Sequence, residues 1–275
     1  MSATNPLITT EAWQRTPPPA DGITTFRLAS WAKYFDLLET EVFPASGPKH
    51  RYIWRGQRSR SWSLSSSLDR LFDKLNRLNK GPLELERLSA EHLEAFKYAA
   101  RGRRGPNPAE LLENDWWALG QHFGLATPLL DWTRSPFAAA YFAFEELSDI
   151  EEFRVVYGLD QDAVQQKNRE LSTGPSIELG RTPIVEFIDP MSDENQRLVS
   201  QGGLFTRAPI GWSIERWVSE RFENSPDPVL LRIEIPSSDR LACLRTLSRM
   251  NISHLSLFPD LTGSSRATNL RLELE

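Results

Sequence analysis

An almost wholly apolar helix is the feature that most constrains the fold of this chain. The segment PFAAAYFAFEEL begins at Pro136, a residue that suits the first turn of a helix, and continues to Leu147. Because apolar side chains surround such a helix, it has to be covered on all sides, and we expect it at the centre of the domain. Its apolar run from Phe137 to Phe144, the longest in the chain, is far too short to cross a bilayer. The pattern therefore predicts a core helix and no membrane span.

The composition provides enough apolar material for a buried core, with 40% hydrophobic side chains in 275 residues. A single cysteine, Cys243, excludes an intramolecular disulfide framework and a zinc site built from several thiolates, and LACLRTL is typical of a buried helix face. The first twenty residues lack the basic-then-apolar order of a signal peptide, so we expect a cytoplasmic protein. A net charge of -5 argues against a chain that wraps nucleic acid along its whole surface.

The order of the predicted elements favours an α+β fold. We predict helices over residues 30–43, 66–78, 83–101, 108–123 and 136–147, and strands near 50–56, 153–159, 183–188, 203–206, 229–235 and 252–258. Helices thus fill the N-terminal half, and a mixed or antiparallel sheet forms mainly from later strands. We expect a single domain over residues 25–275 after a disordered or loosely attached arm at residues 1–24. No GxGxxG or Walker-type loop indicates a Rossmann or P-loop domain.

The first candidate motif is WRGQ, at the end of the strand near residue 54. Arg55 presents a fork of donors suited to phosphate, Gly56 allows a ligand to approach the backbone, and Gln57 adds an amide. An arginine in this position is equally typical of a pair with a core carboxylate such as Asp131.

The second motif, GQHFGLATPLLDWTRSP, places His122, Asp131, Trp132 and Thr133 next to apolar structure. Each has a structural alternative: Asp131 or Thr133 as a helix cap, and His122 as a histidine at a helix C-terminus. Buried polar groups need partners, so we predict that Arg55, His122 and Asp131 converge.

The third motif is QGGLFTRAP, in which Gln201 precedes two glycines and the aromatic Phe205. This pattern suits close approach of a ligand, and it also fits a bulge or tight turn. Asn195 and Arg197 precede it and are candidates to anchor the loop or add a cation for phosphate. Glu234, in LRIEIP, fits the outward face of an amphipathic strand better than a catalytic carboxylate. His254 and Asp260 are more typical of loop anchors than of catalysts.

These blocks, in this order, resemble the successive motifs of the FRG domain family: YIWRGQ, SWSLSSSLDR, LGQHFGLATPLLDWTRSPFAAAYFA, NQRLVSQGGLFTRAP and HLSLFPDLTG. The resemblance covers about residues 25–265. Tryptophan stands here where the family name has phenylalanine or tyrosine, while the arginine and glycine are retained.

FRG domains are similar in this motif to ADP-ribosyltransferases, whose first core strand often carries an aromatic-Arg-Gly motif. The resemblance therefore implies an NAD-consuming ADP-ribosyltransferase, with an ADP-ribosyltransferase-like core, acting as a bacterial toxin or antiphage-defence effector. NAD would be a substrate, the acceptor a macromolecule such as RNA, DNA or protein, and an antitoxin or regulator a further partner. It assigns catalytic roles to His122, Asp131 and Gln201, and NAD-binding roles to Trp54, Arg55, Gly56, Gln57, Trp132, Thr133 and Phe205. The Ser-Thr-Ser strand and Glu/Gln-x-Glu turn of the arginine-directed transferases have no clear counterpart.

A non-catalytic module that binds nucleic acid or protein remains the alternative. In that case the polar groups form a structural network, and surface arginines contact phosphates, the candidates being Arg58, Arg60, Arg101, Arg103 and Arg104. A metal-dependent nuclease is disfavoured, because the chain has four histidines and no paired ligand spacing.

Overall fold

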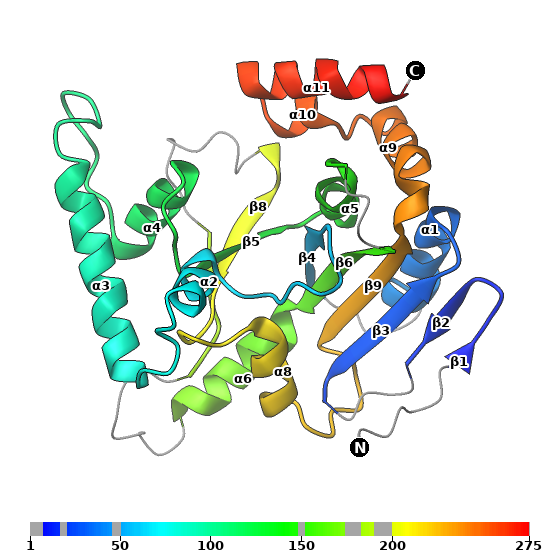
Figure 1. The fold of residues 1–275 in the computed structure, drawn as a ribbon. Helices are drawn as coiled ribbons and strands as arrows, with labels where there is room; N and C mark the ends of the chain where they lie inside the picture. Colours follow the sequence, from blue (N-terminus) through cyan, green and yellow to red (C-terminus); the bar gives the residue numbers. More distant parts are fainter. Residues whose placement is uncertain are drawn as a thin grey trace.

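A mixed β-sheet forms the centre of the protein (Figure 1). The computed structural model describes residues 8–16, 21–45, 51–147, 152–173, 183–189 and 200–274. Within these ranges nine strands form one sheet, in the spatial order β1 (Ile8–Thr9), β2 (Trp13–Arg15), β3 (Ile23–Leu28), β9 (Leu230–Pro236), β6 (Phe153–Asp160), β4 (Tyr52–Gln57), β5 (Leu129–Thr133), β8 (Gly203–Arg207) and β7 (Glu186–Ile188). Strands β3 and β9 are parallel and the other pairs are antiparallel. The predicted α+β class with a mixed sheet is confirmed.

Helices cover both faces of this sheet and extend beyond one end of it. The described helices are η1 (Trp31–Lys33), α1 (Tyr34–Leu37), η2 (Leu38–Val42), α2 (Ser67–Lys74), α3 (Pro82–Ala99), α4 (Glu113–His122), α5 (Pro136–Phe144), α6 (Gln161–Thr173), α8 (Ile214–Arg221), η3 (Ser237–Asp239), α9 (Arg240–Arg249), α10 (His254–Leu257) and α11 (Leu261–Leu274). None of the described helices is long and apolar enough to cross a membrane.

Helix α5 lies at the centre of the largest apolar cluster, as its composition predicts. Ala139, Ala140, Ala143 and Phe144 are completely buried, and the helix packs directly on β4. A Cβ atom on Gly56 would lie 1.9 Å from the main-chain oxygen of Ala139. Gly56 therefore serves close packing of strand against helix, which corrects the expectation that it leaves room for a ligand.

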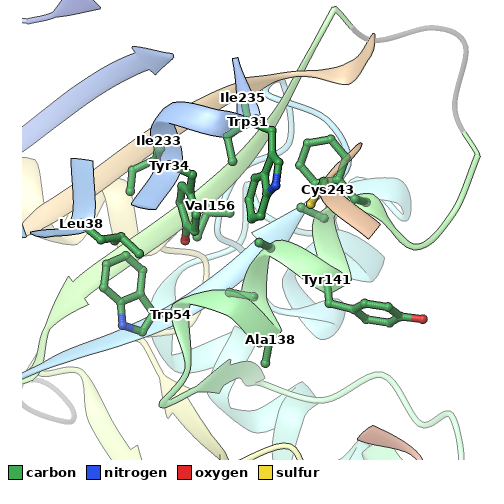
Figure 2. Packing of buried hydrophobic residues seen from close by; sticks show 14 of the residues in the cluster. Trp31, Tyr34, Leu38, Trp54, Ala138, Tyr141, Val156, Ile233, Ile235 and Cys243 are labelled. Carbon is green, nitrogen blue, oxygen red and sulfur yellow. The ribbon is translucent and has the colours of Figure 1, made fainter. Parts of the chain in front are cut away.

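The same cluster joins α5 to the N-terminal and C-terminal parts of the chain. Figure 2 shows Trp31 and Tyr34 packed beside Ile233 and Ile235 of β9, with Cys243 of α9 nearby. Cys243 is a buried free thiol, and its prediction as a core residue is confirmed. Burial raises its pKa far above the ordinary value, so it stays protonated.

Two further apolar clusters hold the remaining helices. Trp217 of α8 and Val164 of α6 pack on the opposite sheet face from α5, together with Tyr157 and Leu230. Helices α2, α3 and α4 pack around Trp117 and reach the β5–β8 end of the sheet, the left side of Figure 1. This third cluster positions the C-terminal end of α4 next to β5.

The sheet corrects two sequence predictions. The expected arm at residues 1–24 is not loose where the structure describes it: β1 pairs with β2, and β2 with β3. The segment Ile252–Phe258, predicted as a strand, instead contains helix α10. Its buried residues His254 and Leu257 are three positions apart, which is the spacing of one helix face and not the alternation of a strand.

Candidate functional site

Strands β4 and β5 diverge, and the side chain of Arg55 occupies the place where they separate. Their ladder consists of one residue pair, Trp54 with Thr133. Beyond it, Nη1 of Arg55 donates to the main-chain oxygen of Asp131 at 2.7 Å and lies 3.6 Å from that residue's Oδ2. Desolvation lowers the pKa of Arg55, and the Asp131 charge opposes that effect. The predicted proximity of Arg55 and Asp131 is confirmed.

Gln121, not His122, is the α4 residue that reaches Asp131. Nε2 of Gln121 donates to Oδ1 of Asp131 at 2.6 Å, and the hydroxyl of Thr127 donates to Oε1 of Gln121. His122 is exposed, and its ring packs edge-on against Phe123 with 4.9 Å between centroids. Successive helical residues point about 100° apart, so only one of the two can face β5. The prediction that His122 joins this group is wrong.

A pocket of about 260 Å³ lies beside the Arg55–Asp131 pair. We call it the Arg55 pocket; it is lined by Trp54, Arg55, Gly56, Asp131, Trp132, Thr133, Phe142, Glu145, Gln201 and Phe258. Its residues come from β4, β5, the end of α5 and the segments preceding β8 and following α10. Segments distant in the sequence thus build one concave site.

Gln201 ties two of these segments together. Its main-chain oxygen accepts from the Thr133 hydroxyl at 2.6 Å, and its Nε2 donates to the main-chain oxygen of Leu257 at 3.2 Å. Gln201 lines the pocket as predicted, while its amide also fixes the end of α10. Asn195 and Arg197, the other candidates in this region, lie outside the described residues.

Glu145 is a pocket residue that the sequence analysis did not identify. It directly follows α5, and its side chain is 16% exposed. Burial, and secondarily the charge of Glu146, raises the pKa of Glu145 from 4.5 to about 7. The sequence feature that could have indicated Glu145 is the pair of consecutive glutamates at the end of an apolar helix. A carboxyl group in a pocket that titrates near neutral pH is suited to accept or donate a proton.

A histidine and a tyrosine adjoin this carboxyl group. Nδ1 of His254 lies 2.8 Å from the Tyr141 hydroxyl and 3.3 Å from Oε2 of Glu145. In Figure 2 the ring of Tyr141 points away from the core around Trp31. Burial lowers the pKa of His254, so the contact with Glu145 is not a stable ion pair. His254 packs on Phe258, with ring centroids 4.5 Å apart, and thereby supports a pocket wall.

Several predicted NAD-binding residues are core residues. Trp132 is buried and its indole donates to the Thr206 hydroxyl at 2.8 Å, while Phe205 belongs to the cluster of α2, α3 and α4. Gln57 is buried and donates to the main-chain oxygen of Ser63 at 3.3 Å. Trp54, Trp132 and Thr133 do contribute atoms to the pocket wall; Phe205 and Gln57 do not. The aromatic side chains available in the pocket besides these tryptophans are Phe142 and Phe258.

The surface arginines of the alternative prediction lie in two places. Arg103 and Arg104 line a groove of about 770 Å³ with Phe96, Leu119 and Phe123, which we call the α3–α4 groove. The guanidinium of Arg101 lies 3.5 Å from the ring centroid of Tyr98 near that groove. The other two, in the segment after β4, are oriented toward acidic side chains: Arg58 toward Glu146 and Arg60 toward Glu152.

Comparison with known proteins identifies part of this arrangement. Residues 50–152 match the model of the FRG domain family. This segment, which is less than half of the chain, is similar to FRG domains. The FRG match includes Arg55, Gly56, Asp131 and Glu145, whereas Gln201 and Phe258 lie beyond it.

Neither the curated proteins nor the solved structures provided a match to this chain. In the ranges that the structure describes, no group of three His, Cys, Asp or Glu side chains is placed to hold a metal ion.

Proposed function

We propose that this protein is an NAD-consuming ADP-ribosyltransferase that modifies a macromolecule at the Arg55 pocket. The observation that carries the proposal is the position of Glu145, a carboxyl group with a pKa of about 7, in the same pocket as the Arg55–Asp131 pair. Transfer of a glycosyl group requires a cationic holder for phosphate, negative charge near the reacting sugar and a proton acceptor. The pocket contains one residue suited to each requirement.

The size of the pocket, about 260 Å³, supports binding of the nicotinamide ribose of NAD with its adjoining phosphate, and the adenosine half would lie outside. Phe142 and Phe258 provide apolar surface for the nicotinamide ring. Arg55 faces the same space, and its Nε is buried without a hydrogen-bond partner among the described residues. A guanidinium with a spare donor is suited to a phosphate oxygen of the ligand.

The reaction replaces one bond at the ribose C1′ carbon. The bond from C1′ to the nicotinamide nitrogen breaks, its electron pair leaves with nicotinamide, and the ribose acquires oxocarbenium character. Asp131, with a carboxylate 61% exposed and held by Gln121, supplies negative charge that stabilises this cation. The acceptor atom then bonds to C1′, and its proton passes to the carboxylate of Glu145.

A binding module is the second candidate, and the α3–α4 groove favours it. Apolar walls there lie beside Arg103 and Arg104, a combination that suits the bases and phosphates of a single nucleic-acid strand. In the transferase this groove would instead hold the acceptor. Loss of nucleic-acid binding on Arg103→Gln, without any NAD turnover in the unaltered protein, would support the module.

Purified protein with labelled NAD and separate pools of DNA, RNA and cell protein provides the test. We expect nicotinamide release and label transfer into one pool, both lost in Glu145→Ala and Asp131→Ala, and both retained in His122→Ala as the exposed neighbour control. Absence of release and transfer in every pool, from folded protein freed of any inhibitor, would contradict the transferase. The same assay, repeated in extracts from phage-infected bacteria, would test the proposed toxin or defence role and the presence of an antitoxin or regulatory partner.

A further inference from the structure

A second cavity, separate from the Arg55 pocket, lies over strands β2, β3 and β9. It measures about 410 Å³ and is lined mainly by polar side chains, including Arg27, Arg60, Arg232, Glu234, Thr25 and Ser61. We call it the arginine cavity. None of its lining residues lines the Arg55 pocket. Three guanidinium groups line this cavity, although the chain as a whole has a net charge of -5.

Glu234 organises two of the three arginines. Arg27 is opposite Glu234 in the parallel register of β3 and β9, and its Nε lies 2.9 Å from Oε2. Nη2 of Arg232 lies 3.0 Å from Oε1 of the same carboxylate. The side chain of Glu234 is 4% exposed, so the prediction that it lies on the outward face of the strand is wrong. One buried carboxylate thus holds two guanidinium groups side by side.

The third guanidinium, that of Arg60, comes from the segment after β4. The main-chain oxygen of Arg60 accepts a hydrogen bond from Nη2 of Arg232 at 2.8 Å. The guanidinium groups of Arg60 and Arg27 both lie over the ring of Phe153, at 5.5 and 4.9 Å from its centroid. The only carboxylate beside Arg60 among the described residues is that of Glu152, 3.9 Å away and 73% exposed, which screens it weakly.

The cavity wall therefore carries two more positive charges than negative ones. The Nε atom of Arg232 is buried and has no hydrogen-bond partner among the described residues. Arginine side chains bind phosphate through two parallel hydrogen bonds, and a phosphate monoester carries nearly two negative charges at neutral pH. Hydroxyl groups of Thr25 and Ser61 add neutral polar contacts. The positive charge of the cavity wall and the residue types that line it both suit a dianionic phosphate.

We propose that the arginine cavity binds a terminal phosphate monoester, from either a mononucleotide or a phosphorylated nucleic-acid end. The phosphate oxygens contact Arg27, Arg60 and Arg232. Glu234 keeps Arg27 and Arg232 in position. The site does not depend on the reaction proposed for the Arg55 pocket.

Calorimetric titration at low ionic strength tests this site, using inorganic phosphate, AMP, adenosine, and a short oligonucleotide with a 5′-phosphate or a 5′-hydroxyl end. We expect binding of phosphate and AMP but not of adenosine. Preference for the 5′-phosphate oligonucleotide over AMP would identify a nucleic-acid end as the source, and the reverse order a mononucleotide. Each charged hydrogen bond lost should weaken binding about tenfold, so Arg27→Gln and Arg60→Gln should each show that decrease.

Two other variants make the test specific. Arg216→Gln removes an exposed arginine of α8 that pairs with Glu220, and it should leave phosphate binding unchanged. Glu234→Gln retains all three arginines but removes the carboxylate that positions Arg27 and Arg232, so it should weaken phosphate binding. Absence of phosphate binding from the unaltered protein would overturn the proposal, as would binding that Arg27→Gln and Arg60→Gln leave intact. Circular dichroism confirms that each variant is folded.

Discussion

Oε2 of Glu145 lies 3.3 Å from Nδ1 of His254, and the same nitrogen is 2.8 Å from the Tyr141 hydroxyl. One ring nitrogen carries at most one proton, so it can act as donor to only one of these oxygens. Oε2 of Glu145 is close enough to His254 for an ion pair, but it makes no hydrogen bond to any of the described residues. The longer contact is therefore the unsatisfied one, in keeping with the raised pKa of Glu145.

Glu145→Gln should stabilise the protein at alkaline pH and leave it unchanged at pH 4. The pKa of Glu145 is about 7 in the folded protein against an ordinary 4.5, so the folded state binds this proton more tightly. Binding of this proton contributes its full stabilisation below pH 4.5, and the contribution is lost as the pH rises through 7. The free energy of unfolding falls by about 3 kcal/mol over that range. Chemical denaturation of both proteins between pH 4 and 8 measures the difference.

The comparison between the two proteins isolates Glu145, because other titrating groups are common to both. Among these are Glu146, Arg58 and Arg266, whose charges act on Glu145, and His254, whose pKa burial lowers. A constant difference in stability across the pH range would contradict the raised pKa of Glu145.

Gly56→Ala should prevent folding or destabilise the protein by more than about 3 kcal/mol. The added Cβ would lie 1.9 Å from the main-chain oxygen of Ala139 and 2.6 Å from the nitrogen of Ala143, and neither backbone atom can rotate away. Gly81→Ala is the matched control, since nothing lies within 4 Å of its Cβ position. Urea denaturation of both variants tests this. A Gly56→Ala protein as stable as the control would contradict the close packing of β4 on α5.

Gln121→Ala should reduce NAD turnover nearly as much as Asp131→Ala. Its amide holds Oδ1 of Asp131 at 2.6 Å, and without it the largely exposed carboxylate is free to rotate. Loss of such orientation lowers turnover by about tenfold to a hundredfold. His122→Ala changes the adjacent, exposed residue and should retain full turnover. Equal losses in both variants would mean that α4 is disturbed as a whole.

Arg55→Lys should lower the free energy of unfolding of the protein and, in the proposed transferase, its affinity for NAD. Lysine retains the charge but not the planar fork that donates to the Asp131 main-chain oxygen, and a hydrogen bond from a charged group contributes about 1.5–3 kcal/mol. The free energy of unfolding and the KM for NAD are the measurements. A raised KM with unchanged stability would place Arg55 in ligand binding alone, whereas the reverse result would reduce Arg55 to the core arginine that its motif also allows.

The sequence was sufficient to predict the central helix, the strand around Arg55 and the proximity of Asp131. Each depends on local composition or on the need of a buried charge for a partner. The choice between Gln121 and His122 was not accessible, because it depends on the rotation of α4 about its axis against β5. Both side chains are polar and typical of active sites, and only packing distinguishes them.

Glu145 and α10 illustrate a second limit of sequence reasoning. A glutamate after an apolar helix is typical of a solvated helix end, and the C-terminal segment that buries it lies over one hundred residues later. The segment around His254 contains enough apolar residues for a strand, but Ser253 caps a short helix instead. Such long-range contacts determine the raised pKa of Glu145, so they could not be predicted from its neighbours.

The strand order shows that residues 50–152, the segment that matches the FRG family, do not contain the complete sheet. A fragment of residues 50–152 would retain β4 and β5, which share a single residue pair, and would lack β6 and β8, their main partners in the sheet. Both strands would then present unpaired backbone groups along an edge, the arrangement that promotes aggregation. Expression of the family segment alone should therefore give insoluble protein, and swapping it between relatives would require β6, β8 and β9 to be transferred with it.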